Sequence, residues 1–180
     1  PTTRELAKMM AAMIGVYCAS YPAAPAAVTL DIDDTCDVVH GYQQLSFWNG
    51  HHGERCFLPI HVYDTATGRP VAMLLRTGKT PSGVEAVGHI RRLVRHIRRH
   101  WPDTRITIRG DPEVMAFCEA AGVDYVFGLP TNATLRANPD IVAAADACAV
   151  RRAEAQVPVL RAYAETRYGA KSWNSQRRVV

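Results

Sequence analysis

Alternating hydrophobic and polar positions dominate the first half of the chain and predict short β-strands. Three segments carry the β-branched and aromatic residues that favour strands: residues 28–33 (VTLDID), 56–63 (CFLPIHVY) and 71–75 (VAMLL). The run 64–68 (DTATG) predicts a hairpin that joins the second strand to the third. Residues 46–53 (SFWNGHHG) have the composition of a turn.

Elsewhere the hydrophobic period changes to three and four residues, which predicts amphipathic helices. The clearest covers residues 83–100, whose apolar positions are Val84, Val87, Ile90, Val94 and Ile97. The other predicted helices cover residues 6–17, with Thr2 and Glu5 at capping-box spacing, 112–121, which Gly122 ends, and 138–156. Two further strands are predicted at residues 105–109 (RITIR) and 123–129 (VDYVFGL), and the tail 160–180 resumes a strand pattern.

The order of these elements predicts an α/β fold. An antiparallel three-strand start followed by alternating helices and strands implies a mixed sheet covered by helices on both faces. We expect residues 28–33, 56–63 and 71–75 to be consecutive antiparallel neighbours, and residues 105–109 to lie beside 28–33. The ribonuclease-H-like architecture has this order, and the sequence predicts an incomplete version of it.

Composition narrows the class of protein. Hydrophobic residues make up 48% and charged residues 21% of the 180 residues, which excludes intrinsic disorder. The net charge of +4 permits a nucleic-acid partner without requiring one. The five cysteines form an odd set without a close pair, which predicts reduced thiols in a cytoplasmic protein. The apolar segment 9–19 is too short to span a bilayer, so no membrane association is expected.

Four aspartates, Asp31, Asp33, Asp34 and Asp37, gather at the end of the first predicted strand. Because side chains alternate along a strand, Asp31 and Asp33 should share one face. Carboxylates there are costly unless they are solvated, paired or bound to a cation, and Mg²⁺ prefers such oxygen ligands. The alternative is a polar strand end that leads into an Asp-rich turn.

Asp111 directly follows the predicted strand 105–109, at the kind of strand end where ligands collect in open α/β sheets. It also begins the series Asp111-Pro112-Glu113, which has the features of a helix start with Asp as the N-cap. The sequence therefore allows two roles for Asp111, that of a metal ligand and that of a helix cap.

The predicted helix 83–100 carries five arginines on its outer surface: Arg91, Arg92, Arg95, Arg98 and Arg99. A basic stripe of this density can neutralise phosphates, although a solvated helix face explains it too. A structural zinc site is a weaker alternative, because the histidines and cysteines between Cys36 and His61 lack zinc-finger spacing. No segment has the pattern of a phosphate-binding loop or a dinucleotide fingerprint.

Three stretches of the sequence resemble one family. VTLDIDDTCDVVHGYQQLSFWNGHHGERCFLPIHVYD resembles the first catalytic-strand region of DDE-type bacterial insertion-sequence transposases, the transposase DDE domain group 1. WPDTRITIRGD followed by PEVMAFCEAAGVDYVFGLPTN resembles the second-acid region, and SWNSQRRVV resembles the segment that opens a β-rich insertion. The resemblance covers most of the chain.

The resemblance implies metal-dependent phosphodiester cleavage and strand transfer on DNA. Asp33, followed by Thr35 in an Asp-x-Thr context, matches the first acid of the catalytic triad, and Asp31 is an alternative. Asp111 matches the second acid. Two Mg²⁺ or Mn²⁺ ions would clamp the attacking and leaving oxygens. The implied partners are transposon-end DNA and a second copy in a synaptic homodimer.

The chain departs from the family pattern in two places. Family members carry a few residues of Ser-His-Tyr type between the second acid and the Pro-Glu-Val helix, but here Asp111 abuts Pro112. The third acid, a Glu expected after the insertion, has no counterpart before Val180, and Glu165 precedes that insertion. We therefore expect a truncated fragment that is inactive alone, and its status as an enzyme stays open.

The expected domains are an N-terminal helix and linker at residues 1–27, a partial catalytic core at 28–158, and the truncated start of the insertion at 159–180. Two other functions stay open beside the transposase fragment. One is a non-catalytic DNA-binding remnant that uses the basic helix, and the other is a small Mg²⁺-dependent nuclease.

Overall fold

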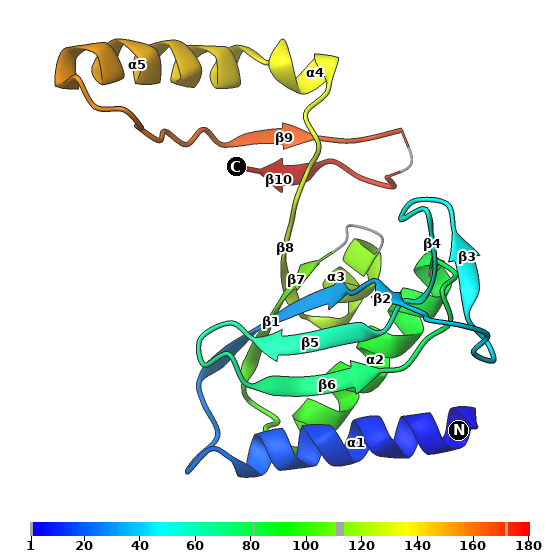
Figure 1. The fold of residues 1–180 in the computed structure, drawn as a ribbon. Coiled ribbons are helices and arrows are strands. Elements are labelled where there is room, and N and C mark those ends of the chain that lie inside the picture. The colour runs from blue at the N-terminus through cyan, green and yellow to red at the C-terminus, as the bar shows by residue number, and fades with distance from the viewer. Residues whose placement is uncertain (1, 81, 111–113, 172) are drawn as a thin grey trace. The chain divides into compact units, whose positions relative to one another are not determined.

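The computed structural model describes residues 2–80, 82–110, 114–171 and 173–180. They form two compact units, Pro1–Gly128 and Leu129–Val180. The first unit contains a five-stranded mixed sheet in the order β6-β5-β1-β7-β8, shown in Figure 1. Its strands are β1 (Ala27–Asp34), β5 (Ile60–Asp64), β6 (Pro70–Leu74), β7 (Arg105–Gly110) and β8 (Asp124–Phe127).

The pairing of these strands confirms the predicted neighbours. Strand β1 pairs antiparallel with β5, and β5 pairs antiparallel with β6. On its other edge β1 pairs parallel with β7, and β7 pairs parallel with β8. An antiparallel start joined to a parallel half, with β1 in the centre, is the strand order of the ribonuclease-H-like fold that the sequence predicted.

Three helices pack against this sheet: α1 (Thr3–Ala19), α2 (Gly83–His100) and α3 (Met115–Ala121). All three contribute to one hydrophobic core together with alternate residues of β1, such as Val28 and Leu30. The sequence predicted helices on both faces, but within the first unit these helices share the face that the apolar residues define. The opposite face of β1 carries Asp31 and Asp33, which are not part of that core.

The helix ends follow local rules that the sequence contained. The Thr2 amide donates to Glu5 Oε2 at 2.7 Å, and the Glu5 amide donates to Thr2 Oγ1 at 3.3 Å, which completes the predicted capping box of α1. The Glu85 amide donates to Ser82 Oγ at 3.3 Å at the start of α2. Gly122 ends α3 in a left-handed conformation with φ of 60°, which glycine adopts at low cost.

The segment predicted as one strand at residues 56–63 is two strands in different sheets. β4 (Glu54–Phe57) ends before Leu58-Pro59, and β5 begins at Ile60. Pro59 cannot donate to a ladder, and its carbonyl oxygen accepts a hydrogen bond from the Thr35 amide at 3.1 Å. The prediction of a continuous strand was wrong because this proline interrupts the ladder.

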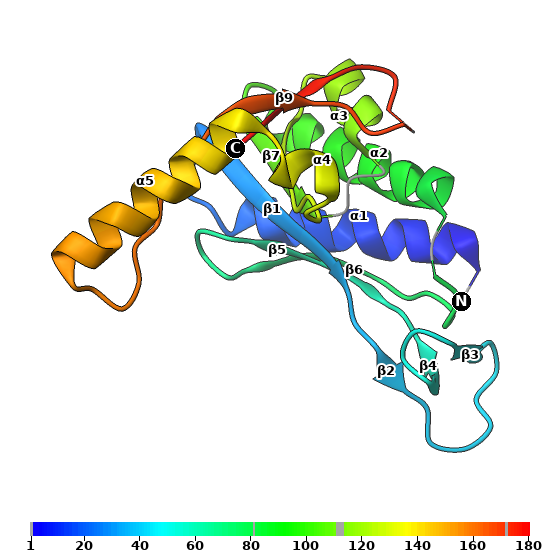
Figure 2. The same cartoon turned by 90° about the horizontal axis from the view of Figure 1, so that it is seen from above.

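Strand β4 is the centre of a small three-stranded sheet in the order β2-β4-β3, with β2 (Asp37–Val38) and β3 (Phe47–Asn49). Both pairings are antiparallel. Strand β3 lies inside the segment 46–53 that was predicted to be a turn, so that prediction missed it. In Figure 2, β2 follows directly from the carboxyl end of β1, so the small sheet lies next to that end.

The second unit contains α4 (Ala133–Arg136), α5 (Pro139–Ala155), β9 (Thr166–Tyr168) and β10 (Arg177–Val179). The Asp140 amide donates to Asn138 Oδ1 at 3.0 Å, so Asn138 is the N-cap of α5. Helix α5 lies within the helix predicted at residues 138–156. Strands β9 and β10 pair antiparallel, which confirms that strands resume in the tail. The first unit ends before the expected core boundary at residue 158, and α5 has no buried residue.

Candidate functional site

The candidate site lies on the polar face of the five-stranded sheet, near the carboxyl end of β1. Leu30 is buried in the core, whereas Asp31 and Asp33 are on the other face of the strand. This alternation is the one that the period of two in VTLDID predicted. The carboxylates therefore share a face, as expected.

Asp31 is already paired with a cation. It lies in register with Arg109 of the parallel neighbour β7, and Arg109 Nη1 is 3.6 Å from Asp31 Oδ2. Both side chains are about half exposed, so the pair contributes little to stability, but it places a positive charge beside the Asp31 carboxylate. Asp31 is consequently less suited to bind a cation than Asp33.

Asp33 is exposed at the penultimate position of β1. Its Oδ1 accepts a hydrogen bond from the Asp34 amide at 2.9 Å, and among the described residues it has no ion-pair partner. The antiparallel register places His61 of β5 directly opposite Asp33. In the sequence, His61 stood out only as a possible zinc ligand, although the alternation in PIHVYD could have placed it on the same face as the aspartates.

Asp111 lies outside the described residues, as do Pro112 and Glu113. The strand that leads to it is described up to Gly110, the last residue of β7. A Cβ atom at Gly110 would lie 3.0 Å from the carbonyl oxygen of Ile32, so the end of β7 approaches β1 closely one residue before Asp33. The parallel strands β1 and β7 thus end at the same edge of the sheet.

The donor set decides which metal could bind. Among the described residues, no group of three or more His, Cys, Asp or Glu side chains could hold a metal ion, which gives no support to a structural zinc. Asp33 by itself offers hard carboxylate oxygens on an exposed face, the kind of ligand that Mg²⁺ and Mn²⁺ prefer. Asp33 therefore fits a divalent cation that takes further ligands from elsewhere.

The arginines of α2 divide into two groups. Arg98 Nη1 donates to the carbonyl oxygen of Ala121 at 2.9 Å, and its Nη2 donates to that of Gly122 at 3.0 Å, so Arg98 caps the end of α3. The Arg91 guanidinium lies 5.6 Å from the centre of the Phe117 ring. Arg92, Arg95 and Arg99 are exposed and leave three positive charges on the outer face of α2.

In the described part of the chain, no helix is both long enough and apolar enough to cross a membrane.

A comparison with solved structures found complexes of the Mos1 transposase. The Mos1 mariner paired-end complex with Mn has 13% identity and a TM-score of 0.37. The Mos1 paired-end complex with the left transposon end has 14% identity and a TM-score of 0.38. The similarity covers 73% and 74% of this chain but only 44% of each Mos1 chain, so this chain spans less than half of their length.

No curated protein matches the sequence. The model of the family described as transposase DDE domain group 1 matches residues 1–180, which is the whole chain. The match agrees with the family that the sequence itself resembles, and the chain belongs to the transposase DDE domain group 1 family.

Proposed function

We propose that this chain is part of the catalytic core of a DNA transposase, with Asp33 and Asp111 as two of its metal-binding acids. The reaction is metal-dependent phosphodiester cleavage and strand transfer at insertion-sequence ends. The observation that carries the proposal is the position of Asp33, which is exposed and accepts one hydrogen bond, from the Asp34 amide, but has no ion-pair partner among the described residues. It lies at the sheet edge where β7 ends one residue before Asp111.

The residues of the site have separate tasks in this proposal. Asp33 and Asp111 bind the cation, and Arg109 neutralises Asp31, which lowers the repulsion among the carboxylates of β1. When bound, Mg²⁺ or Mn²⁺ stabilises the charge that develops on the attacking and leaving oxygens of a phosphodiester. The transposon-end DNA lies at the carboxyl end of β1, and two copies form the synaptic complex. Arg92, Arg95 and Arg99 lie on the outer side of α2, away from the sheet, and bind phosphates of DNA as a second, separate surface.

The metal site predicts a thermal shift. Mn²⁺ at about ten times its dissociation constant should raise the free energy of unfolding by about 1.4 kcal/mol, or the melting temperature by roughly 3–6 °C. Asp33→Asn and Asp111→Asn should each abolish this shift. Asp34→Asn is the matched control, because Asp34 is the exposed neighbour on the other face of β1. Differential scanning calorimetry with and without Mn²⁺ measures all four proteins.

The same experiment separates the roles of Asp111. If Asp111 only caps a helix, Asp111→Asn keeps the Mn²⁺ response of the wild type, because asparagine caps helices about as well as aspartate. If the wild type itself shows no Mn²⁺ shift, the shared metal site is absent. The non-catalytic DNA-binding remnant is then the better function.

The arginines of α2 predict a change in salt dependence. Replacing Arg92, Arg95 and Arg99 together with alanine should lower the slope of log K against log salt by about 3 units, because each lost phosphate contact lowers it by roughly one. Binding should weaken equally on transposon-end and unrelated DNA. Fluorescence anisotropy between about 50 and 200 mM salt tests this. An unchanged slope would mean that this face is merely solvated.

The preference of the protein for one nucleic acid over another distinguishes a transposase from a small nuclease. The transposase proposal expects tighter binding to insertion-sequence ends than to scrambled DNA or RNA of the same length. Equal binding to all three favours the nuclease.

A further inference from the structure

The polar face of the sheet also carries two aromatic side chains, His61 and Tyr63 of β5, beside the carboxylates of β1. They alternate with the buried residues of β5, so both lie on the face away from the core. The antiparallel register places His61 opposite Asp33 and Tyr63 opposite Asp31. Side chains opposite each other in such a pair have Cβ atoms about 4.5–5.5 Å apart. The imidazole of His61 is therefore a neighbour of the proposed metal site.

Tyr63 holds the imidazole of His61 from one side. The two rings are stacked, with 6.1 Å between their centroids and 16° between their planes. The Tyr63 hydroxyl lies 3.5 Å from His61 Nδ1. A phenol hydroxyl is a stronger donor than the N–H of a neutral imidazole, so the hydroxyl donates and Nδ1 accepts. A neutral imidazole that accepts at Nδ1 carries its proton on Nε2.

The Nε2 atom of His61 is left for a ligand. Among the described residues it has no hydrogen-bond partner, and it is not one of the buried polar atoms that lack one, so solvent reaches it. An Nε2 that carries a proton cannot bind a cation but can donate to an anionic oxygen. Mg²⁺ also prefers oxygen ligands to imidazole nitrogen. The ligand that fits an N–H donor beside a carboxylate-bound cation is an oxygen of a phosphate.

We infer that the Nε2–H of His61 donates to a non-bridging oxygen of the phosphodiester that the cation at Asp33 binds, and that Tyr63 is a positioning residue for His61. A fixed donor aimed at an oxygen on which charge develops stabilises the transition state of phosphoryl transfer. The inference rests on the proposed function, because it assumes a cation at Asp33 and a DNA phosphate beside it.

The first measurement determines the tautomer of His61 in the full chain. Long-range proton–nitrogen NMR spectra of isotope-labelled protein distinguish Nε2–H from Nδ1–H at about pH 8, where an ordinary histidine is neutral. The wild type should show the Nε2–H form. Tyr63→Phe should shift the Nδ1 resonance, because it keeps the ring but removes the hydroxyl that donates to Nδ1. A wild type in the Nδ1–H form would overturn the inference and make Nε2 a candidate metal ligand.

The second measurement adds MgCl₂ and dimethyl phosphate, a minimal phosphodiester that has no base sequence. Dimethyl phosphate should shift the Nε2 resonance of His61 only when Mg²⁺ is present. The signal belongs to His61, so phosphate bound at the arginines of α2 does not contribute to it. In the variants, the Asp34 amide reports binding, because it donates to Asp33 Oδ1.

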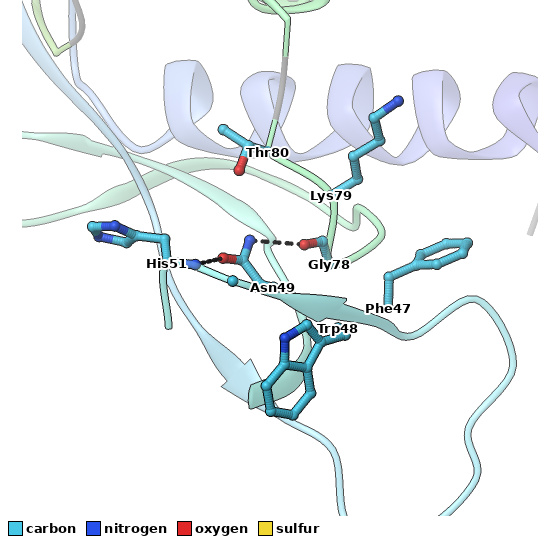
Figure 3. Close-up of a pocket in the computed structure, with 8 residues that line it drawn as sticks. Phe47, Trp48, Asn49, His51, Gly78, Lys79 and Thr80 are labelled. Atoms are coloured by element: carbon cyan, nitrogen blue, oxygen red, sulfur yellow. Dashed lines mark hydrogen bonds between the residues drawn. The ribbon is translucent and has the colours of Figure 1, made fainter. Parts of the chain in front are cut away.

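Variants of His61 test the donor itself. His61→Ala should weaken the Mg²⁺-dependent binding of dimethyl phosphate roughly 5- to 20-fold, and His61→Gln should keep part of the affinity, because its amide also donates. His51→Ala is the matched control, since His51 is an exposed histidine in the turn after β3. Figure 3 shows that His51 bonds to Asn49 through its backbone amide, which alanine retains.

The outcomes separate this inference from the proposed function. If Mg²⁺ shifts the Asp34 amide but dimethyl phosphate leaves Nε2 of His61 unchanged, the inference is wrong and the proposed function stands. If Mg²⁺ shifts neither residue, the metal site is absent and both are wrong. Equal losses in His61→Ala and His51→Ala would also overturn the role of His61.

Discussion

Replacing Arg76 with alanine is expected to lower the free energy of unfolding by about 3 kcal/mol, because it removes a buried guanidinium that donates hydrogen bonds to three acceptors. The Arg76 side chain is only 5% exposed, and its Nε donates to Glu85 Oε1 at 2.8 Å. Its Nη1 donates to the carbonyl oxygen of Leu58 at 3.3 Å, and its Nη2 to that of Lys79 at 3.2 Å. Alanine leaves all three acceptors without this donor.

The loss corresponds to a fall in melting temperature of roughly 6–12 °C for a chain of this length. Arg105→Ala is the matched control, because Arg105 Nε is 3.8 Å from Asp124 Oδ2 but both side chains are well exposed. It should change stability by no more than about 0.5 kcal/mol. Urea unfolding of both variants measures the difference. Equal losses in the two would mean that burial of the Arg76 guanidinium contributes nothing.

The strands of the central sheet could be predicted because the patterns that indicate them lie within short stretches of the sequence. VTLDID alternates with a period of two, and the run 64–68 carries its own turn signal, so β1, β5 and β6 could be predicted from short windows. Two features broke that pattern. Pro59 ends a ladder inside an apolar run, and Phe47 with Trp48 forms a strand whose rings stay exposed, so β3 has no hydrophobic period to detect.

The candidate site was predictable only in part. Alternation placed Asp31 and Asp33 on one face, but their partners come from register between strands that are distant in the sequence. Arg109 pairs with Asp31 through β7, and His61 lies opposite Asp33 through β5. A side-chain period within one strand carries no information about which residue faces it across the sheet.

The partners of the arginines on α2 could not be predicted from the sequence either. Its five arginines look equivalent in the sequence, since all lie outside the apolar stripe of α2. Packing against α3 assigns Arg98 to two backbone carbonyls and Arg91 to the Phe117 ring. Only the tertiary structure separates these two from Arg92, Arg95 and Arg99, which stay exposed.

Asp64→Ala should destabilise the first unit by about 3 kcal/mol at neutral pH, since hydrogen bonds to a buried carboxylate are among the stronger ones. Asp64 is 1% exposed. Its Oδ2 accepts from the hydroxyls of Tyr17 at 3.2 Å, of Thr67 at 2.8 Å and of Tyr21, and its Oδ1 accepts from the Ala66 amide at 3.0 Å. Asp103→Ala, at an exposed position, should be nearly neutral.

The contribution of Asp64 should also depend on pH in a defined direction. Burial by itself raises the pKa of Asp64, but hydrogen bonds from Tyr21, Thr67, the Ala66 amide and Tyr17 outweigh it, and the pKa lies below its ordinary value. A carboxyl whose pKa is lowered by folding stabilises the protein above its unfolded pKa of about 3.9 and loses that effect as the pH falls through the folded pKa.

The stability gap between wild type and Asp64→Ala should therefore be constant between about pH 5 and 8 and narrow below about pH 4. Alanine cannot titrate, so only the wild type loses the stabilisation that the ionised carboxylate supplies. Urea unfolding of both proteins at a series of pH values down to about 3 measures the gap. A gap that stays constant or widens on acidification would show that the hydroxyl and amide donors around Asp64 do not favour its ionised form.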